Sequence, residues 1–152
     1  MLLVINAGSS SIKLAVFDAS LAEIARGHVE EIAQGGHGVA LANGLRQTGL
    51  NLPDLTAVAH RVVHGGEALV APCRVTEAVM AGIAACVPLA PLHNPANLTG
   101  SKVMATLAPH LPQYASFDTA FHATNPSVAV RYAIPQEAHD AGIRRYGGRP
   151  RR

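Results

Sequence analysis

The first two apolar stretches of this chain are separated by residues that could bind phosphate. Between Leu2–Asn6 and Ile12–Phe17 lie a glycine and three serines, and Lys13 follows at once. Glycine lets the backbone turn tightly, and hydroxyl and free N–H groups at such a turn can face phosphate oxygens. Lys13 adds a positive charge within reach of the same phosphates. The turn is no Walker loop, because G-x-x-x-x-G-K-[ST] is absent and a strand follows it. Taken alone, it also fits an ordinary hairpin.

Three more polar residues stand within or at the end of apolar runs. Arg61 lies in the valine-rich run Ala57–Val63, which predicts a strand covered on both faces. A guanidinium buried there needs an anionic partner, either an internal carboxylate or a bound anion. Asp118 directly follows the run Gln113–Phe117, at the strand end where α/β sheets place ligands; a turn or N-cap role is the alternative. Asn6 ends the first strand, where an amide often only caps a turn.

The histidine and cysteine spacings indicate neither a zinc site nor a disulfide. His60 and His64 are four residues apart, which suits a metal site on a helix but places them about 13 Å apart along a strand. Cys73 and Cys86 lack C-x-x-C spacing and are typical of free thiols in a reducing compartment. We therefore expect a cytoplasmic protein.

Composition and charge narrow the function classes. The chain has 152 residues, of which 49% are hydrophobic and 14% charged, as expected for one folded core. No apolar run approaches the ~20 residues of a membrane span, and the N-terminus lacks the basic region of a signal peptide. The formal charge is +2, but without Arg149, Arg151 and Arg152 it would be −1. The basic balance thus belongs to the C-terminal residues, and we expect no nucleic-acid or membrane partner.

The elements that must position these residues follow from the apolar pattern. Five strands are predicted, at Leu2–Asn6, Ile12–Phe17, Ile24–Ile32, Ala57–Val63 and Gln113–Phe117. The glycine-rich, polar residues 34–50 indicate a loop with at most a short helix. Val79, Ile83 and Cys86 recur at helical spacing within a predicted helix over 76–87. Asn94 followed by proline predicts the N-cap of a second helix.

Three strands followed by alternating helix and strand predict an α/β fold with a ribonuclease-H-like mixed sheet. A longer pattern supports this. Four segments, Val4–Ser11, His60–Glu67, Ala90–Asn97 and Phe117–His122, resemble in order and spacing the acetate kinase family of acyl-phosphate-forming kinases. The family belongs to the sugar kinase, heat-shock ATPase and actin superfamily. The resemblance identifies residues 1–147 as an N-terminal ribonuclease-H-like domain and leaves 148–152 as a divergent basic tail, expected to be disordered.

The resemblance implies roles for the substrate side of the site. Arg61 would hold the substrate carboxylate and neutralise phosphoryl oxygens, while Val63 and Leu92 would form an apolar pocket for the substrate methyl group. Asp118 corresponds to a catalytic position described as exchanging a proton. A carboxylate substrate has a pKa near 4 to 5, however, and carries no proton at neutral pH. We therefore expect Asp118 to order metal-bound water or to pair with an arginine.

The resemblance also implies roles for the nucleotide side. Ser9, Ser11 and Lys13 would contact ATP, and Asn6 would help to hold Mg²⁺ near the transferred phosphate. An amide oxygen suits a hard cation that keeps most of its waters.

The implied reaction is ATP + acetate ⇌ ADP + acetyl phosphate, by a homodimer when the enzyme is full-length. A propionate or butyrate kinase, or a catalytically inactive fragment, is the alternative. Family members continue after Gly147 with Phe-His-Gly-Thr-Ser-His, whereas this chain ends with Gly148–Arg152. We expect an out-of-frame tail or a truncated gene, with the second domain of the enzyme missing.

Overall fold

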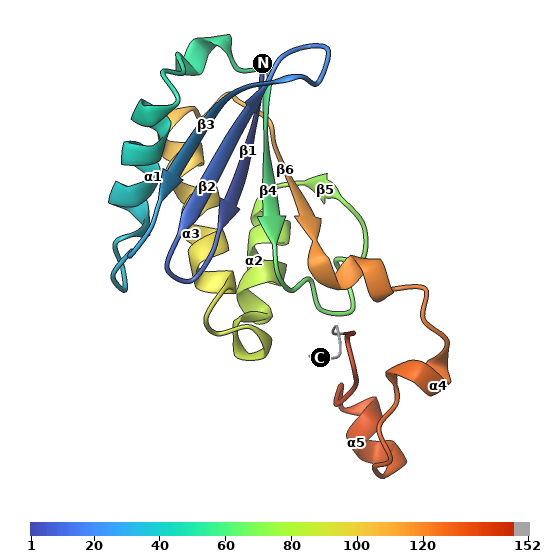
Figure 1. Cartoon of the computed structure of the whole chain (residues 1–152). Helices are drawn as coiled ribbons and strands as arrows, with labels where there is room; N and C mark the ends of the chain where they lie inside the picture. The colour runs from blue at the N-terminus through green and yellow to red at the C-terminus, as the bar shows by residue number, and fades with distance from the viewer. Residues whose placement is uncertain (148–152) are drawn as a thin grey trace.

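The body of the molecule is a six-stranded mixed sheet in the order β3-β2-β1-β4-β6-β5 (Figure 1). The structure is a computed structural model that describes residues 1–147. Its strands are β1 (Leu2–Ala7), β2 (Ile12–Phe17), β3 (Glu23–Val29), β4 (Ala57–Val62), β5 (Cys73–Arg74) and β6 (Gln113–Phe117). The first three strands pair antiparallel, whereas β1, β4 and β6 run parallel. This mixed topology confirms the predicted fold class.

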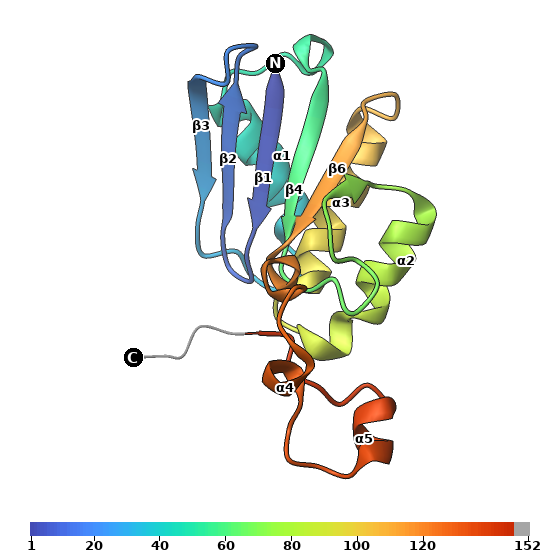
Figure 2. The ribbon, with the colours of Figure 1, turned by 90° about the vertical axis from the view of Figure 1, so that its right-hand side faces the viewer.

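The helices lie mainly on one side of the sheet. α1 (His37–Gln47), α2 (Glu77–Ala85) and α3 (Asn94–Leu107) cover one face, and the described residues leave the other face open (Figure 2). The short helices α4 (Ser127–Val130) and α5 (Gln136–Asp140) belong to an extension below the sheet (Figure 1). Single turns of 3₁₀ helix lie at η1 (Leu52–Asp54), η2 (Val87–Leu89) and η3 (Asp118–His122). Among residues 1–147, no helix is long and apolar enough to cross a membrane.

Strand periodicity decides which side chains reach the open face. In β1, Leu3, Ile5 and Ala7 are buried against the helices, so the intervening Val4 and Asn6 point to the opposite side. The same alternation runs through β2, β4 and β6. The helix-facing side chains form the main core, while the open face carries the polar residues at the strand ends.

The prediction of a loop over 34–50 was wrong, because α1 occupies eleven of these residues. Its buried positions, His37, Ala40, Leu41, Gly44 and Leu45, follow helical spacing. Gly44, which obscured this pattern in the sequence, allows α1 to pack closely against β3. A Cβ on Gly27 of β3 would lie 2.5 Å from the carbonyl oxygen of Gly44. The helix and strand therefore touch through their backbones.

The predicted start of the second helix needs correction. The N-cap of α3 is His93. Asn94 is the first residue of the helix, and its side chain is fully buried. The amide of Asn94 makes its hydrogen bonds to neighbouring segments instead of capping its own helix. β3 ends at Val29, short of the predicted Ile32. The two-residue β5 was not predicted, and the predicted tail 148–152 lies outside the described residues.

Candidate functional site

A row of polar side chains crosses the open face of the sheet near the carboxyl ends of β1 and β4. Lys13 of β2 is paired with Asn6 of β1, and Asn6 with Arg61 of β4. Arg61 is in turn paired with Ser116 of β6. Neighbouring strands are about 4.8 Å apart, so these residues from distant parts of the sequence lie side by side. Asp118 follows β6 directly and completes the cluster.

Arg61 is held by two of the residues predicted for the site. Its Nε and Nη2 atoms donate to the two carboxylate oxygens of Asp118, at 2.9 and 2.5 Å. Its Nη1 donates to Asn6 Oδ1 at 3.0 Å. Within residues 1–147, three of the five guanidinium N–H groups are thus used, which leaves one on each Nη nitrogen without an acceptor there. A planar guanidinium fixed in this way can still present two donors to an anion.

The expected burial of Arg61 was wrong, since about half of its side chain is exposed. The described helices cover only one face of the sheet, and Arg61 points to the other. The anionic partner expected for it is present as Asp118. Hydrogen bonding to this carboxylate raises the pKa of Arg61 above its usual value, so the guanidinium is charged at any physiological pH.

Two side chains from elsewhere in the fold bind the carbonyl groups of the predicted phosphate turn. Asn97 Nδ2 donates to the Ala7 carbonyl at 2.7 Å, and His37 Nε2 donates to the Gly8 carbonyl at 2.8 Å. Gly8 N–H donates to Ser11 O at 2.7 Å across the turn. The amides of residues 9–11 have no acceptor within residues 1–147. Consecutive free amides are the backbone arrangement that binds anions.

A cavity of about 630 Å³ opens beside the Arg61–Asp118 pair. Its walls include Val63 and, from the end of the described chain, Tyr146. Leu92, predicted to share an apolar pocket with Val63, is 72% exposed and does not line this cavity. The cluster therefore unites Asn6, Arg61, Val63 and Asp118. Lys13 lies beside Asn6 on the next strand, whereas Leu92 lies apart.

Two asparagines of α3 hold the strand ends in place, a role that the sequence did not indicate for either of them. Asn97 accepts a hydrogen bond from Val63 N at 3.1 Å while donating to Ala7 O, so it connects the ends of β4 and β1. Asn94 accepts from His64 N at 3.2 Å and donates to His64 O at 3.0 Å. Both are almost fully buried. Their signal is the spacing Asn94, Asn97, Ser101, a polar stripe on the helix face that packs on the sheet.

The residues present form no direct metal cage. Within residues 1–147, no three His, Cys, Asp or Glu side chains are close enough to share a metal ion. The oxygen donors at the cluster, Asn6 Oδ1 and the Asp118 carboxylate, already accept from the Arg61 cation. Each of these oxygens keeps one lone pair, which fits a water ligand of a hydrated Mg²⁺ better than the ion itself.

Sequence comparison finds relatives along nearly the whole chain. The model of the acetokinase family matches residues 39–149. An acetate kinase of Deinococcus deserti is 41% identical over 169 aligned residues, covering 95% of this chain and 42% of that protein. The chain thus spans less than half the length of the curated relative it matches.

Solved structures share the same fold. Acetate kinase of Porphyromonas gingivalis superposes with a TM-score of 0.85 at 34% identity, over 96% of this chain and 44% of that one. A propionate kinase of Francisella tularensis superposes with a TM-score of 0.84 at 36% identity, over the same 96% and 44%.

Proposed function

Because this chain belongs to the acetokinase family, we propose that it forms the substrate-carboxylate side of a kinase for acetate. The kinase transfers the γ-phosphoryl group of ATP reversibly to acetate and yields ADP and acetyl phosphate. The observation that carries this proposal is the fixed Arg61 guanidinium with two unused N–H donors at the mouth of a cavity.

Arg61 accounts for substrate binding and for charge neutralisation in the same place. Its two free donors match the two oxygens of a carboxylate. As the phosphoryl group approaches, the same cation opposes the negative charge on its oxygens. Asp118 acts as the positioning residue for Arg61, because a carboxylate nucleophile has no proton to give up. Val63, in the cavity wall, supplies an apolar contact for the methyl group, and we propose that Leu92 adds a second one when substrate is bound.

The hairpin turn supplies the nucleotide side. We propose that the free amides of residues 9–11, the hydroxyls of Ser9 and Ser11 and the ammonium of Lys13 contact the ATP phosphates. When bound with ATP, Mg²⁺ would supply neutralisation of the phosphate charge. Asn6 would hold one of its waters through the remaining lone pair of Oδ1.

The test is an acetyl phosphate assay, with hydroxylamine as the trap, on a chimaera. Residues 1–147 of this chain replace the matching part of the Deinococcus deserti enzyme, and the 152-residue chain alone is assayed beside it. We expect the chimaera to form acetyl phosphate and its Arg61→Ala variant to lose most of that activity. Arg61-independent turnover would contradict the proposal. An inactive chain alone with an active chimaera would support the fragment alternative.

Propionate is the second candidate substrate, because a propionate kinase superposes as well as an acetate kinase does. One methylene changes selectivity by only about 1–3 kcal/mol. The ratio of kcat/KM for acetate, propionate and butyrate in the chimaera decides between them.

The proposal includes three further points. We propose that residues 1–147 form one domain, that the full-length enzyme is a homodimer, and that it works in the cytoplasm. Both cysteines are free thiols, which supports a reducing compartment. Sedimentation of the chimaera tests the dimer.

A further inference from the structure

His64, just beyond the end of β4, has a ring held by two contacts and a backbone held by Asn94. Gly66 N–H donates to its Nδ1 at 3.0 Å, so in the neutral ring the proton resides on Nε2. Tyr146 packs edge-on against it, with ring centroids 4.6 Å apart and planes at 70°. The backbone of His64 is held on both sides by Asn94. The ring therefore presents a donor in one defined direction.

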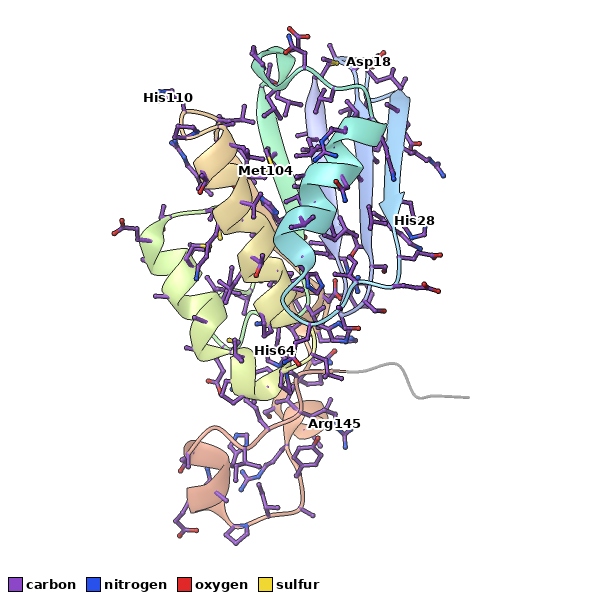
Figure 3. All side chains as sticks on the ribbon, turned by 90° about the vertical axis from the view of Figure 1, so that its left-hand side faces the viewer. Asp18, His28, His64, Met104, His110 and Arg145 are labelled. Carbon is purple, nitrogen blue, oxygen red and sulfur yellow. The ribbon has the colours of Figure 1, made fainter. Side chains whose placement is uncertain are left out.

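That donor is unused and accessible. Within residues 1–147, no acceptor lies within hydrogen-bonding distance of Nε2, and this atom is not among the buried polar atoms without a partner. His64 lines the same 630 Å³ cavity as Arg61 and Asp118. Figure 3 shows it at the lower end of the sheet, far from His110. No structural task in the described fold accounts for an imidazole N–H left free at this place.

The aromatic contact on His64 depends on the last described segment. Tyr146 OH donates to Glu67 Oε1 at 3.4 Å, and Arg144 pairs with Glu67 Oε2 at 3.1 Å. Glu67 thus anchors the segment whose tyrosine packs against the histidine. The charged and titratable groups that line the cavity with His64 are Arg61 from β4, Asp118 and His122 from η3, and Tyr146 from this segment. Glu67 and Cys86 lie close to Tyr146 as well. Burial lowers the pKa of His64, which keeps the ring neutral at physiological pH.

We propose that His64 Nε2–H donates a hydrogen bond to a terminal oxygen of the phosphoryl group of acetyl phosphate, the oxygen that Arg61 cannot reach. This inference rests on the proposed function. A phosphoryl group has three terminal oxygens, and Arg61 has two free N–H groups after its bonds to Asp118 and Asn6. His64 supplies a third donor that lines the same cavity. Because the donor is neutral, it adds no charge to a cavity that already contains the Arg61 cation.

The test is side-chain ¹H–¹⁵N NMR of histidines in the ¹⁵N-labelled 152-residue chain, titrated with acetyl phosphate and, separately, with acetate. We expect the His64 spectrum of the free chain at pH 7.5 to show protonated Nε2 and bare Nδ1. Acetyl phosphate should then shift the Nε2 signal of His64, whereas acetate should not. The titration suits weak binding, which is expected for an open cavity.

Variants separate this inference from the proposed function. His64→Phe keeps a ring against Tyr146 and removes both nitrogens; it should weaken acetyl phosphate binding about tenfold and leave acetate binding unchanged. His110→Phe, toward the other end of the sheet (Figure 3), is the matched control and should bind both as wild type does. An unshifted His64 signal, a shift at His122 alone, or wild-type affinity in His64→Phe would overturn the inference. If Arg61→Ala binds acetate and acetyl phosphate as wild type does, the proposed function fails instead.

Discussion

Arg61 shows how two restraints can prepare an exposed arginine for the anion recognition proposed for it. A free arginine side chain carries about 2 kcal/mol of rotamer entropy, which a binding event would have to overcome. Here Asp118 and Asn6 fix the guanidinium before any ligand arrives. The cost of ordering is thus met during folding, and the two remaining donors can act on a substrate with little further loss.

Substitution at Arg61 should separate charge from geometry. In the chimaera, Arg61→Ala is expected to lower kcat/KM roughly 10²- to 10³-fold. This corresponds to a loss of about 3–4 kcal/mol of transition-state stabilisation, as for other donors to a transition state. Arg61→Lys should recover little, because an ammonium cannot keep Asp118 and Asn6 while presenting two parallel donors. Steady-state kinetics measure both. Arg26→Lys, on an exposed arginine of β3, is the control, and near wild-type turnover in Arg61→Lys would mean that charge alone suffices.

Asp118 offers a test of positioning against proton transfer. Asp118→Asn keeps one acceptor for Arg61 but removes the ion pair, so we expect kcat/KM to fall roughly 10- to 100-fold through a looser guanidinium. The shape of the pH–rate profile between pH 6 and 9 should stay as in the parent chimaera. Disappearance of one limb of that profile in Asp118→Asn would instead assign Asp118 a proton-transfer role.

At the scale of elements, the close contact between α1 and β3 can be tested by replacing Gly27 and Gly38. Gly27→Ala places a Cβ 2.5 Å from the Gly44 carbonyl, so the helix must move and the thermal midpoint should drop by several degrees. Gly38→Ala, on the same helix, meets only Val103 at an ordinary 3.7 Å. This change should stabilise by about 0.5–1 kcal/mol through helix propensity. Thermal unfolding by circular dichroism compares the pair; equal effects would contradict the backbone contact.

The first residue of α3 supports the loop that follows β4. Asn94→Ala removes bonds to His64 N, His64 O and Ile83 O and leaves these buried groups unpaired, at a cost of about 3 kcal/mol. For a chain of this size, such a loss should lower the thermal midpoint by about 6–12 °C. Asn51→Ala, on an exposed asparagine without a side-chain capping bond, is the control and should shift the midpoint by less than 2 °C, about 0.5 kcal/mol. A similar midpoint for both variants would show that Asn94 is dispensable.

Particular elements show what the sequence could and could not reveal. β6 and its following Asp118 were predictable because strand, turn and charge stand in one short stretch. α1 was not, since the glycines that allow its backbone contact with β3 are the residues that indicate a loop. The exposure of Arg61 was equally hidden. A run such as Ala57–Val63 has the same appearance whether helices cover one face of the sheet or both. Asn94 was recognised as a helix start, but its partners lie in distant segments and local sequence cannot name them.

At the scale of the whole molecule, two buried histidines link stability to pH. Burial lowers the pKa of both His60 and His64 below the ordinary 6.5. Between these folded-state values and 6.5 the unfolded chain binds more protons than the folded one, so stability rises with pH through this window. The contribution of the two neutral histidines to the free energy of unfolding is fully present above about pH 6.5. It is lost as the pH falls, by at most about 1.4 kcal/mol per pH unit for each histidine.

Thermal midpoints measured from pH 5 to 8 should therefore fall on the acid side. His60→Gln, which keeps a hydrogen-bonding group next to Gln113, should flatten part of that fall. The exposed His110 provides the control, and His110→Gln should leave the slope unchanged. A slope in His60→Gln equal to that of the parent would exclude His60 as a source of acid sensitivity.

The contacts of Arg61 also connect ligand binding to folding. They join residues 55 and 57 positions away, one on each side in the sequence, and exist only when β1, β4 and β6 are all in register. Parallel pairing of this kind is slow to form. An anion that requires the cluster binds only the completed sheet, so at ten times its dissociation constant it adds about 1.4 kcal/mol to folding. If the proposed function holds, acetate acts as a pharmacological chaperone for the sheet.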